Sequence, residues 1–287
     1  MKRYAKYIAL AVVAIAILRI IDTYSSFNHT VDAPIHIACG LEWLQYGTYS
    51  LEAEHPPLSR IATAIGPYLA GVRLPPNYRE IWQSYRVELG NIALVSGEGY
   101  FSNLLRAKLG VLFFFVMSIA VVWTWARTVS GAVAGMVCVF LYSALPPVLA
   151  HGSVAETDMT LTANLMGALL ALLLWLKRPN LANALFLGLM FGLSLISKLT
   201  TLLFFPACAF VVCLWYWYMK GRVQNDSNVV QLPVLRVLVR QACMSGIVAF
   251  FVFWAGYGFE IGDLHHSKLP GVTTIEWISW YSIPLRN

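Results

Sequence analysis

The sequence alternates long, nearly uninterrupted apolar runs with polar segments. The runs cover residues 7–21, 109–126, 131–149, 159–176, 181–219 and 241–259. A helix of about 20 apolar residues spans the hydrocarbon layer of a bilayer, which is about 30 Å thick. The pattern therefore predicts an all-α membrane protein.

The run from Leu181 to Met219 is too long for a single span at about 1.5 Å per residue. Its polar residues cluster at 197–201, and Lys198 in this cluster would be costly near the bilayer centre. We therefore place a turn at 197–201, which gives about seven transmembrane helices. The first run contains Arg19 and is followed by no clear cleavage site, so an uncleaved anchor is expected rather than a signal peptide.

Composition agrees with this prediction. The chain of 287 residues is 59% hydrophobic and only 12% charged, and its mean hydropathy is +0.65. An ordinary soluble domain has about 25% charged residues, so that class is excluded. The net charge of +6 resides largely in short connections between apolar runs, which indicates membrane orientation and not nucleic-acid binding. The five cysteines show no metal or disulfide spacing and are interpreted as small core residues.

The basic residues predict a single transmembrane module over 1–287 with a cytoplasmic N-terminus. Positive residues mark the cytoplasmic side of membrane proteins, and they occur at 2–6, 127, 177–178 and in the loop 220–240. The outer side is then expected to hold a long loop over 22–108, a link over 151–158, the turn at Lys198 and a tail over 260–287.

Two amphipathic segments are expected within the outer loop, at the membrane interface. Ile37, Leu41 and Leu44 recur at helical spacing after Pro34. A second helix is expected to begin at Pro57 and to place three apolar residues on one face: Ile61, Ile65 and Leu69. The polar stretch from Arg73 to Gly99 is expected to be a surface excursion.

Polar residues from distant parts of the chain converge at the outer leaflet in this topology. They are Asp32, His36, Glu54, His55, His151, Glu156, Asp158 and Lys198. Carboxylates can hold a divalent cation or act as a general base, and a lysine can neutralise a phosphate. A site for a lipid-linked phosphate, a proton or ion pathway and an ordinary interfacial network all remain open. The other outer glutamates are expected to be solvated: Glu42, Glu52, Glu80, Glu88 and Glu98.

Several motifs resemble a known enzyme family when taken together. They are Asp32-Ala33-Pro34-Ile35-His36, Glu54-His55-Pro56-Pro57-Leu58, Thr157-Asp158-Met159 after Pro146-Pro147, and Gly188-Leu189 through Ser197-Lys198. Their order resembles that of the GT-C glycosyltransferases related to protein O-mannosyltransferases, glycosyltransferase family 39. The resemblance extends over about residues 1–260.

This resemblance implies an inverting transfer of a sugar, mannose or another, from a polyprenyl-phosphate donor to a protein or glycolipid hydroxyl on the outer or lumenal face. Asp32 matches the catalytic base of the family. Glu54 and Asp158 match acidic residues that hold a divalent metal, of unknown identity, or the donor phosphate. Lys198 and His55 would bind the donor phosphate.

Two departures from the family pattern leave other functions open. Many relatives carry Asp-Glu where this chain has Asp32-Ala33. The chain also corresponds to the N-terminal part of such enzymes, which puts a complete acceptor site in question. A truncated or non-catalytic subunit that binds a lipid-linked sugar is one alternative. A lipid-linked sugar transporter is another, disfavoured because the middle of each span is nearly all apolar.

Overall fold

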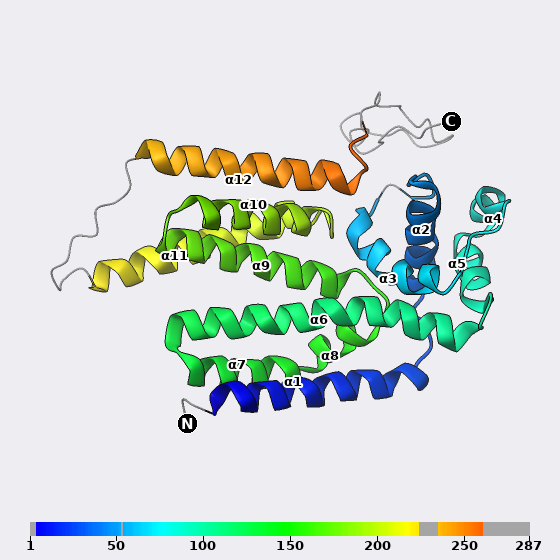
Figure 1. Cartoon of the computed structure of the whole chain (residues 1–287), viewed down its shortest axis with the longest axis horizontal. Helices are drawn as coiled ribbons and strands as arrows, with labels where there is room; N and C mark the ends of the chain where they lie inside the picture. The colour runs from blue at the N-terminus through cyan, green and yellow to red at the C-terminus, as the bar shows by residue number, and fades with distance from the viewer. Residues whose placement is uncertain (1–3, 53, 224–234, 261–287) are drawn as a thin grey trace.

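The computed structural model describes residues 4–52, 54–223 and 235–260, and these residues form helices and no strand. Most helices lie side by side along the long axis of the molecule, and α2 to α5 gather at one end (Figure 1). The bundle contains α1 (Ala5–Asp22), α6 (Tyr100–Ser130), α7 (Ala132–Ala144), α8 (Pro146–Ser153), α9 (Asp158–Lys177), α10 (Leu181–Leu195), α11 (Thr201–Val223) and α12 (Leu235–Gly256). A short 3-10 helix, η1 (Thr23–Ser25), follows α1.

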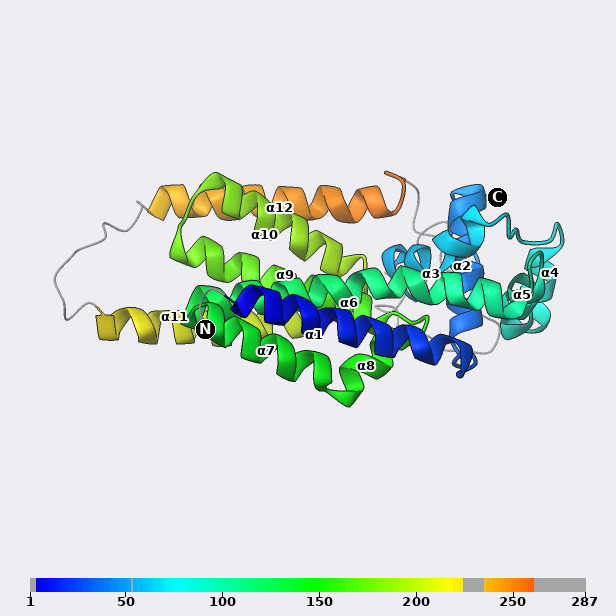
Figure 2. The same ribbon diagram turned by 60° about the horizontal axis from the view of Figure 1, so that its bottom comes forward.

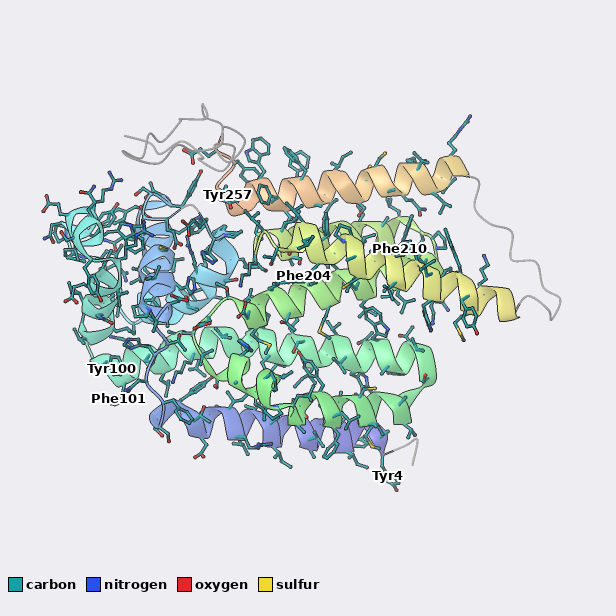
Figure 3. The ribbon with its side chains drawn as sticks, turned by 180° about the vertical axis from the view of Figure 1, so that it is seen from behind. Tyr4, Tyr100, Phe101, Phe204, Phe210 and Tyr257 are labelled. Carbon is teal, nitrogen blue, oxygen red and sulfur yellow. The ribbon has the colours of Figure 1, made fainter. Side chains whose placement is uncertain are left out.

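The chain is a multi-pass membrane protein. Within the described residues, four helices are long and apolar enough to cross a bilayer, namely α6, α9, α11 and α12, and the bent pair α7 and α8 makes up to five. The other two predicted spans are helical as well. However, α1 carries Lys6, Arg19 and Asp22 among its 18 residues, and α10 has only 15 residues. Large exposed side chains such as Phe204 and Phe210 of α11 point away from the bundle, as lipid-facing residues do (Figure 3).

The turn predicted inside the longest apolar run is confirmed, because α10 ends at Leu195 and α11 begins at Thr201. The span expected over 131–149 is broken into two helices. The two helices α7 and α8 meet there at an angle of 65°. Leu145 is extended and precedes Pro146 and Pro147. A proline disfavours helical backbone in the residue before it and cannot donate a helical hydrogen bond, so the helix breaks at Leu145.

The long loop expected over 22–108 folds largely into a compact cap on the end of the bundle. Its helices are α2 (Ala33–Tyr46), α3 (Pro57–Leu69), α4 (Tyr78–Ser84) and α5 (Arg86–Val95). The two helices expected in this loop are confirmed, but Ile37 and Leu41 of α2 are buried in a protein core. The surface excursion expected from Arg73 to Gly99 is wrong, since Trp82, Leu89 and Leu94 lie in the same core.

The cap and the bundle share α6, which is longer than a bilayer requires. At about 1.5 Å per residue its 31 residues extend about 46 Å. Its first turns, with Leu104 and Ala107, pack in the core of the cap. Lys108, expected as the last loop residue, therefore lies inside a helix and is 1% exposed. Its ammonium donates to the carbonyl of Phe27 at 2.8 Å and lies over the ring of Tyr24.

Candidate functional site

A lysine and an aspartate meet where the bundle joins the cap. Lys198, in the turn between α10 and α11, donates from Nζ to Oδ1 of Asp158 at 2.8 Å. Asp158 is the first residue of α9, where the helix dipole favours a negative charge. Nδ1 of His151 lies 3.6 Å from the other carboxylate oxygen, Oδ2. Both Lys198 and Asp158 are partly exposed, with 28% and 38% of their side chains accessible, so an incoming anion can reach them.

The Lys198 turn is held from two sides. From α3, the amide of Leu58 donates to the carbonyl of Ile196 at 3.0 Å, and the hydroxyl of Ser59 donates to the carbonyl of Ser197 at 3.0 Å. From α9, the side-chain amide of Asn164 donates to the hydroxyl of Ser197 at 3.0 Å. The cap thus fixes the position of the lysine, although the two segments are more than a hundred residues apart in the sequence.

A second charged group is formed by the segment that leads into α3 and by the first turn of that helix. Arg60 is 3% exposed, forms an ion pair with the carboxylate of Glu52 and donates to its carbonyl at 2.8 Å. Nδ1 of His55 lies 3.3 Å from Oε1 of Glu52. Ligand atoms of Glu52, Glu54 and His55 lie within 4.8 Å of one another, close enough to share a metal ion. The structure thus groups Glu54 with Glu52 and His55, while Asp158 pairs with Lys198.

Buried His36 lies between the two charged groups. It is 5% exposed, and its Nδ1 has no hydrogen-bond partner among the residues that the structure describes. Its ring centroid lies 5.3 Å from that of His55. Burial lowers the pKa of His36 to about 4, and the positive charges of Arg60, His55 and Lys198 contribute to this shift. His36 is therefore neutral at pH 7 and can accept or donate a hydrogen bond within the site.

Asp32 lies at the start of α2, one helical turn before His36. The amide of His36 donates to the carbonyl of Asp32 at 3.1 Å. The carboxylate of Asp32 is exposed and forms no hydrogen bond or ion pair with the part of the chain that the structure describes. It is thus available to a substrate, but no contact joins it to Lys198 or to Glu54.

Two glutamates that were expected to be solvated are instead held by the protein, Glu42 buried and Glu52 half-buried. Glu42 is 0% exposed and accepts hydrogen bonds from the hydroxyl of Thr48 and the amides of Ser50 and Leu51. Glu52 is held by Arg60. The polar run that follows Gly47 is the sequence signal for the burial of Glu42, because it supplies these donors. Glu80, Glu88 and Glu98 are exposed, as expected.

A small pocket adjoins the second charged group. Besides the charged residues Glu52, His55 and Arg60, it is lined by Cys39, Trp43, Tyr49, Pro57 and Tyr257. Tyr257 follows α12 and lies beside the cap (Figure 3), and its ring meets that of Tyr49 edge-on at 5.3 Å. The Tyr49 hydroxyl also donates to the carboxylate of Glu260. Neither the spacing nor the charge of Trp43, Tyr49 and Tyr257 distinguishes them from interfacial tyrosines and tryptophans, so none of them was predicted as a site residue.

The pKa shifts of His36 and Glu52 predict that the free energy of unfolding falls in two steps as the pH is lowered. The pKa of His36 is lowered from 6.5 to about 4 in the folded state, so protonation favours the unfolded chain. Stability should fall by about 3 kcal/mol as pH drops from about 6.5 to about 4, at about 1.4 kcal/mol per pH unit. Burial alone would raise the pKa of Glu52, but the hydrogen bond from His55 and the charge of Arg60 lower it to about 2. A further loss should therefore follow below about pH 4.5.

Unfolding of the purified protein in detergent, followed from pH 8 down to about pH 2, measures these transitions. The His36→Gln variant should lack most of the slope between pH 6.5 and 4 and keep the loss below about pH 4.5. An unchanged slope in this variant would show that His36 does not carry the upper transition.

These features define a multi-pass helical membrane protein with a charged site where its cap meets the bundle. Residues 101–244 match the dolichyl-phosphate-mannose-protein mannosyltransferase family, and the chain belongs to this family. The resemblance noted in the sequence is thereby confirmed. The matched segment includes Asp158 and Lys198, whereas Asp32, Glu54 and His55 precede it. No curated protein and no solved structure matches the chain.

Proposed function

We propose that the chain transfers a sugar from a polyprenyl-phosphate donor to an acceptor hydroxyl at the junction of cap and bundle. The observation that carries this proposal is the pair formed by Lys198 and Asp158, fixed at the end of the bundle and partly exposed. An ammonium at this level of the membrane suits the phosphate of a lipid whose chain lies among the helices. The family supports the same class of reaction.

Lys198 would stabilise the leaving group. When the bond between the anomeric carbon and the phosphate oxygen breaks, negative charge accumulates on the polyprenyl phosphate. A fixed positive charge beside that oxygen lowers the barrier. Asp158 holds the ammonium in place through the 2.8 Å hydrogen bond. It is the only acidic contact of Lys198 among the described residues, so it sets the orientation of the lysine side chain.

Asp32 would act as the general base. The acceptor oxygen forms a bond to the anomeric carbon from the side opposite the phosphate, and its proton passes to the carboxylate of Asp32. A single displacement of this kind inverts the configuration at that carbon. The exposed carboxylate, with no partner among the described residues, supports this role, because a base must be free to accept a hydrogen bond from its substrate.

A divalent cation fits the group formed by Glu52, Glu54 and His55. Glu52 is already engaged by Arg60, whereas Glu54 is exposed and His55 bonds the described residues only through Nδ1. Glu54 and His55 would thus be the principal ligands. A bound cation would supply additional positive charge near the donor phosphate.

The active face is proposed to be extracytoplasmic. Lys6 at the start of α1, Arg127 near the end of α6 and Lys177 at the end of α9 lie at the end of the bundle away from the cap (Figure 1). Lys177 donates to the carbonyl of Thr128 at 2.9 Å, which joins the ends of α9 and α6. Basic residues at one end favour a cytoplasmic position for that end, and the site is at the other.

Replacement of Asp158 by asparagine tests this proposal. Asp158→Asn should slow transfer from polyprenyl-phosphate sugars roughly 10- to 100-fold. Without its partner the ammonium of Lys198 would shift, and a displacement of about 1 Å in a catalytic site can lower the rate about 100-fold. Glu156→Gln is the matched control, since Glu156 lies in the same segment and forms no polar contact among the described residues. Wild-type activity in Asp158→Asn would refute the proposal. Donor binding without turnover by the wild-type protein would instead support a non-catalytic subunit.

A further inference from the structure

A groove on the flank of the bundle, distinct from the proposed active site, lies between α1 and the bent pair of α7 and α8. It comprises a hollow of about 520 Å³ at the outer end of α1 and a smaller one of about 100 Å³ between α1 and α7. Arg19 lines both hollows. A volume of several hundred Å³ is that of a small-molecule site rather than of a single water.

The break at Leu145 creates the groove. Figure 2 shows α8 turned away from the line of α7, so α1 packs along α7 but not along the whole of α8. Gly152 closes the inner wall, since a Cβ there would lie 3.1 Å from Ile20 and 3.0 Å from Phe115. Leu149, Ala150 and Val154 supply apolar lining.

The rim of the groove carries one positive and one negative charge. Arg19 and Asp22 are both exposed and both line the larger hollow. Neither side chain forms an ion pair or hydrogen bond with the residues that the structure describes. Their neighbours Leu18 and Ile21 are also exposed, at 66% and 40%, as expected of a helix face that meets lipid. Charged side chains near the end of a membrane helix extend to the interface, where lipid headgroups are found.

Two opposite charges three residues apart on a helix match one kind of lipid headgroup. Their Cβ atoms are about 5–6 Å apart at this spacing. The phosphate and ammonium of an ethanolamine headgroup are joined by a short ethylene link, so one headgroup reaches both side chains. A guanidinium binds a phosphate through two parallel hydrogen bonds, and a carboxylate accepts hydrogen bonds from an ammonium. Thr23 and Ser153 add hydroxyls to the rim.

We propose that this groove binds one amine-bearing zwitterionic phospholipid of the phosphatidylethanolamine type. Its phosphate pairs with Arg19, its ammonium with Asp22, and one acyl chain follows the hollows between α1 and α7. An anionic lipid would meet Arg19 equally well but would face Asp22 without a compensating ammonium. The charge pair therefore selects the zwitterionic amine.

Native mass spectrometry of the full chain in detergent tests the proposal. The probes are dioleoyl phosphatidylethanolamine, phosphatidylcholine and phosphatidylglycerol with the same chains. The wild-type protein should retain one phosphatidylethanolamine about tenfold more than phosphatidylglycerol. Arg19→Gln should lose this retention, and Asp22→Asn should lose the preference over phosphatidylglycerol. Arg127→Gln, at the far end of the bundle, is the control and should behave as the wild type.

Three results would overturn the proposal. Equal retention of the three lipids by the wild-type protein would mean that Arg19 and Asp22 contact only bulk headgroups. Unchanged retention in Arg19→Gln would place the bound lipid elsewhere. Displacement of the phosphatidylethanolamine by equimolar polyprenyl phosphate would assign the groove to the donor lipid. Unfolding temperatures of the variants verify that each one folds.

Discussion

Asp32→Asn is expected to slow sugar transfer by about 10²–10⁴-fold, the contribution typical of a positioned general base. An asparagine keeps the size and the backbone position of Asp32 but cannot accept the proton of the acceptor hydroxyl. The side chain is exposed and forms no polar contact with the described residues. The change should therefore leave the cap and its stability unaffected.

Transfer from a labelled polyprenyl-phosphate sugar measures this effect, together with binding of the donor. Donor affinity should stay within about twofold of the wild type, since Asp32 is assigned to the acceptor side. Glu88→Gln, an exposed carboxylate on α5 of the same cap, should transfer at the wild-type rate. Equal transfer rates for Asp32→Asn and the wild type would remove Asp32 from the mechanism.

Lys198→Met should lower transfer by about 10²–10³-fold, as removal of one preorganised electrostatic group typically does. It should also weaken donor binding, because the lysine meets the phosphate in both the ground state and the transition state. Both members of the pair with Asp158 are partly exposed, and such pairs contribute about 1 kcal/mol or less to stability. The variant should consequently fold.

Two further variants separate charge from size at this position. Lys198→Arg keeps the positive charge and should recover part of the activity. Lys177→Met, on the opposite end of the bundle, removes an equivalent side chain and should have no effect on transfer. A Lys198→Met variant as active as Lys177→Met would contradict the assignment.

The helical bundle could be predicted from the sequence because its apolar runs are long and continuous. The turn at Lys198 followed from the cost of burying its charge in lipid. Pro146 and Pro147 mark the end of a helix in the sequence, but the apolar run was not divided there, because its apolar character continues through both prolines. The core of the cap was missed because Trp82 and Leu89 lie among charged residues, where no strong periodicity distinguishes buried from exposed positions.

The sequence predicted that the site residues share one end of the helices, but not which of them form ion pairs. Asp158 and Lys198 could be assigned to one side of the membrane, and the structure places them in contact. Glu52 and Arg60 were not predicted, because their ion pair depends on how the segment before α3 folds back on that helix. His36 was selected in the sequence, but its burial depends on the packing of α2 against α3.

The outer tail predicted over 260–287 lies, apart from Glu260, outside the described residues.

A double-mutant cycle on transfer tests the central claim most directly, namely that Asp158 acts through Lys198 at the donor phosphate. The wild type, Asp158→Asn, Lys198→Met and the double variant are compared with the same polyprenyl-phosphate sugar. The double variant should be about as slow as Lys198→Met alone, because Asp158 has nothing left to position once the lysine is gone. Multiplication of the two single effects would contradict this account, as would transfer at the wild-type rate in the double variant.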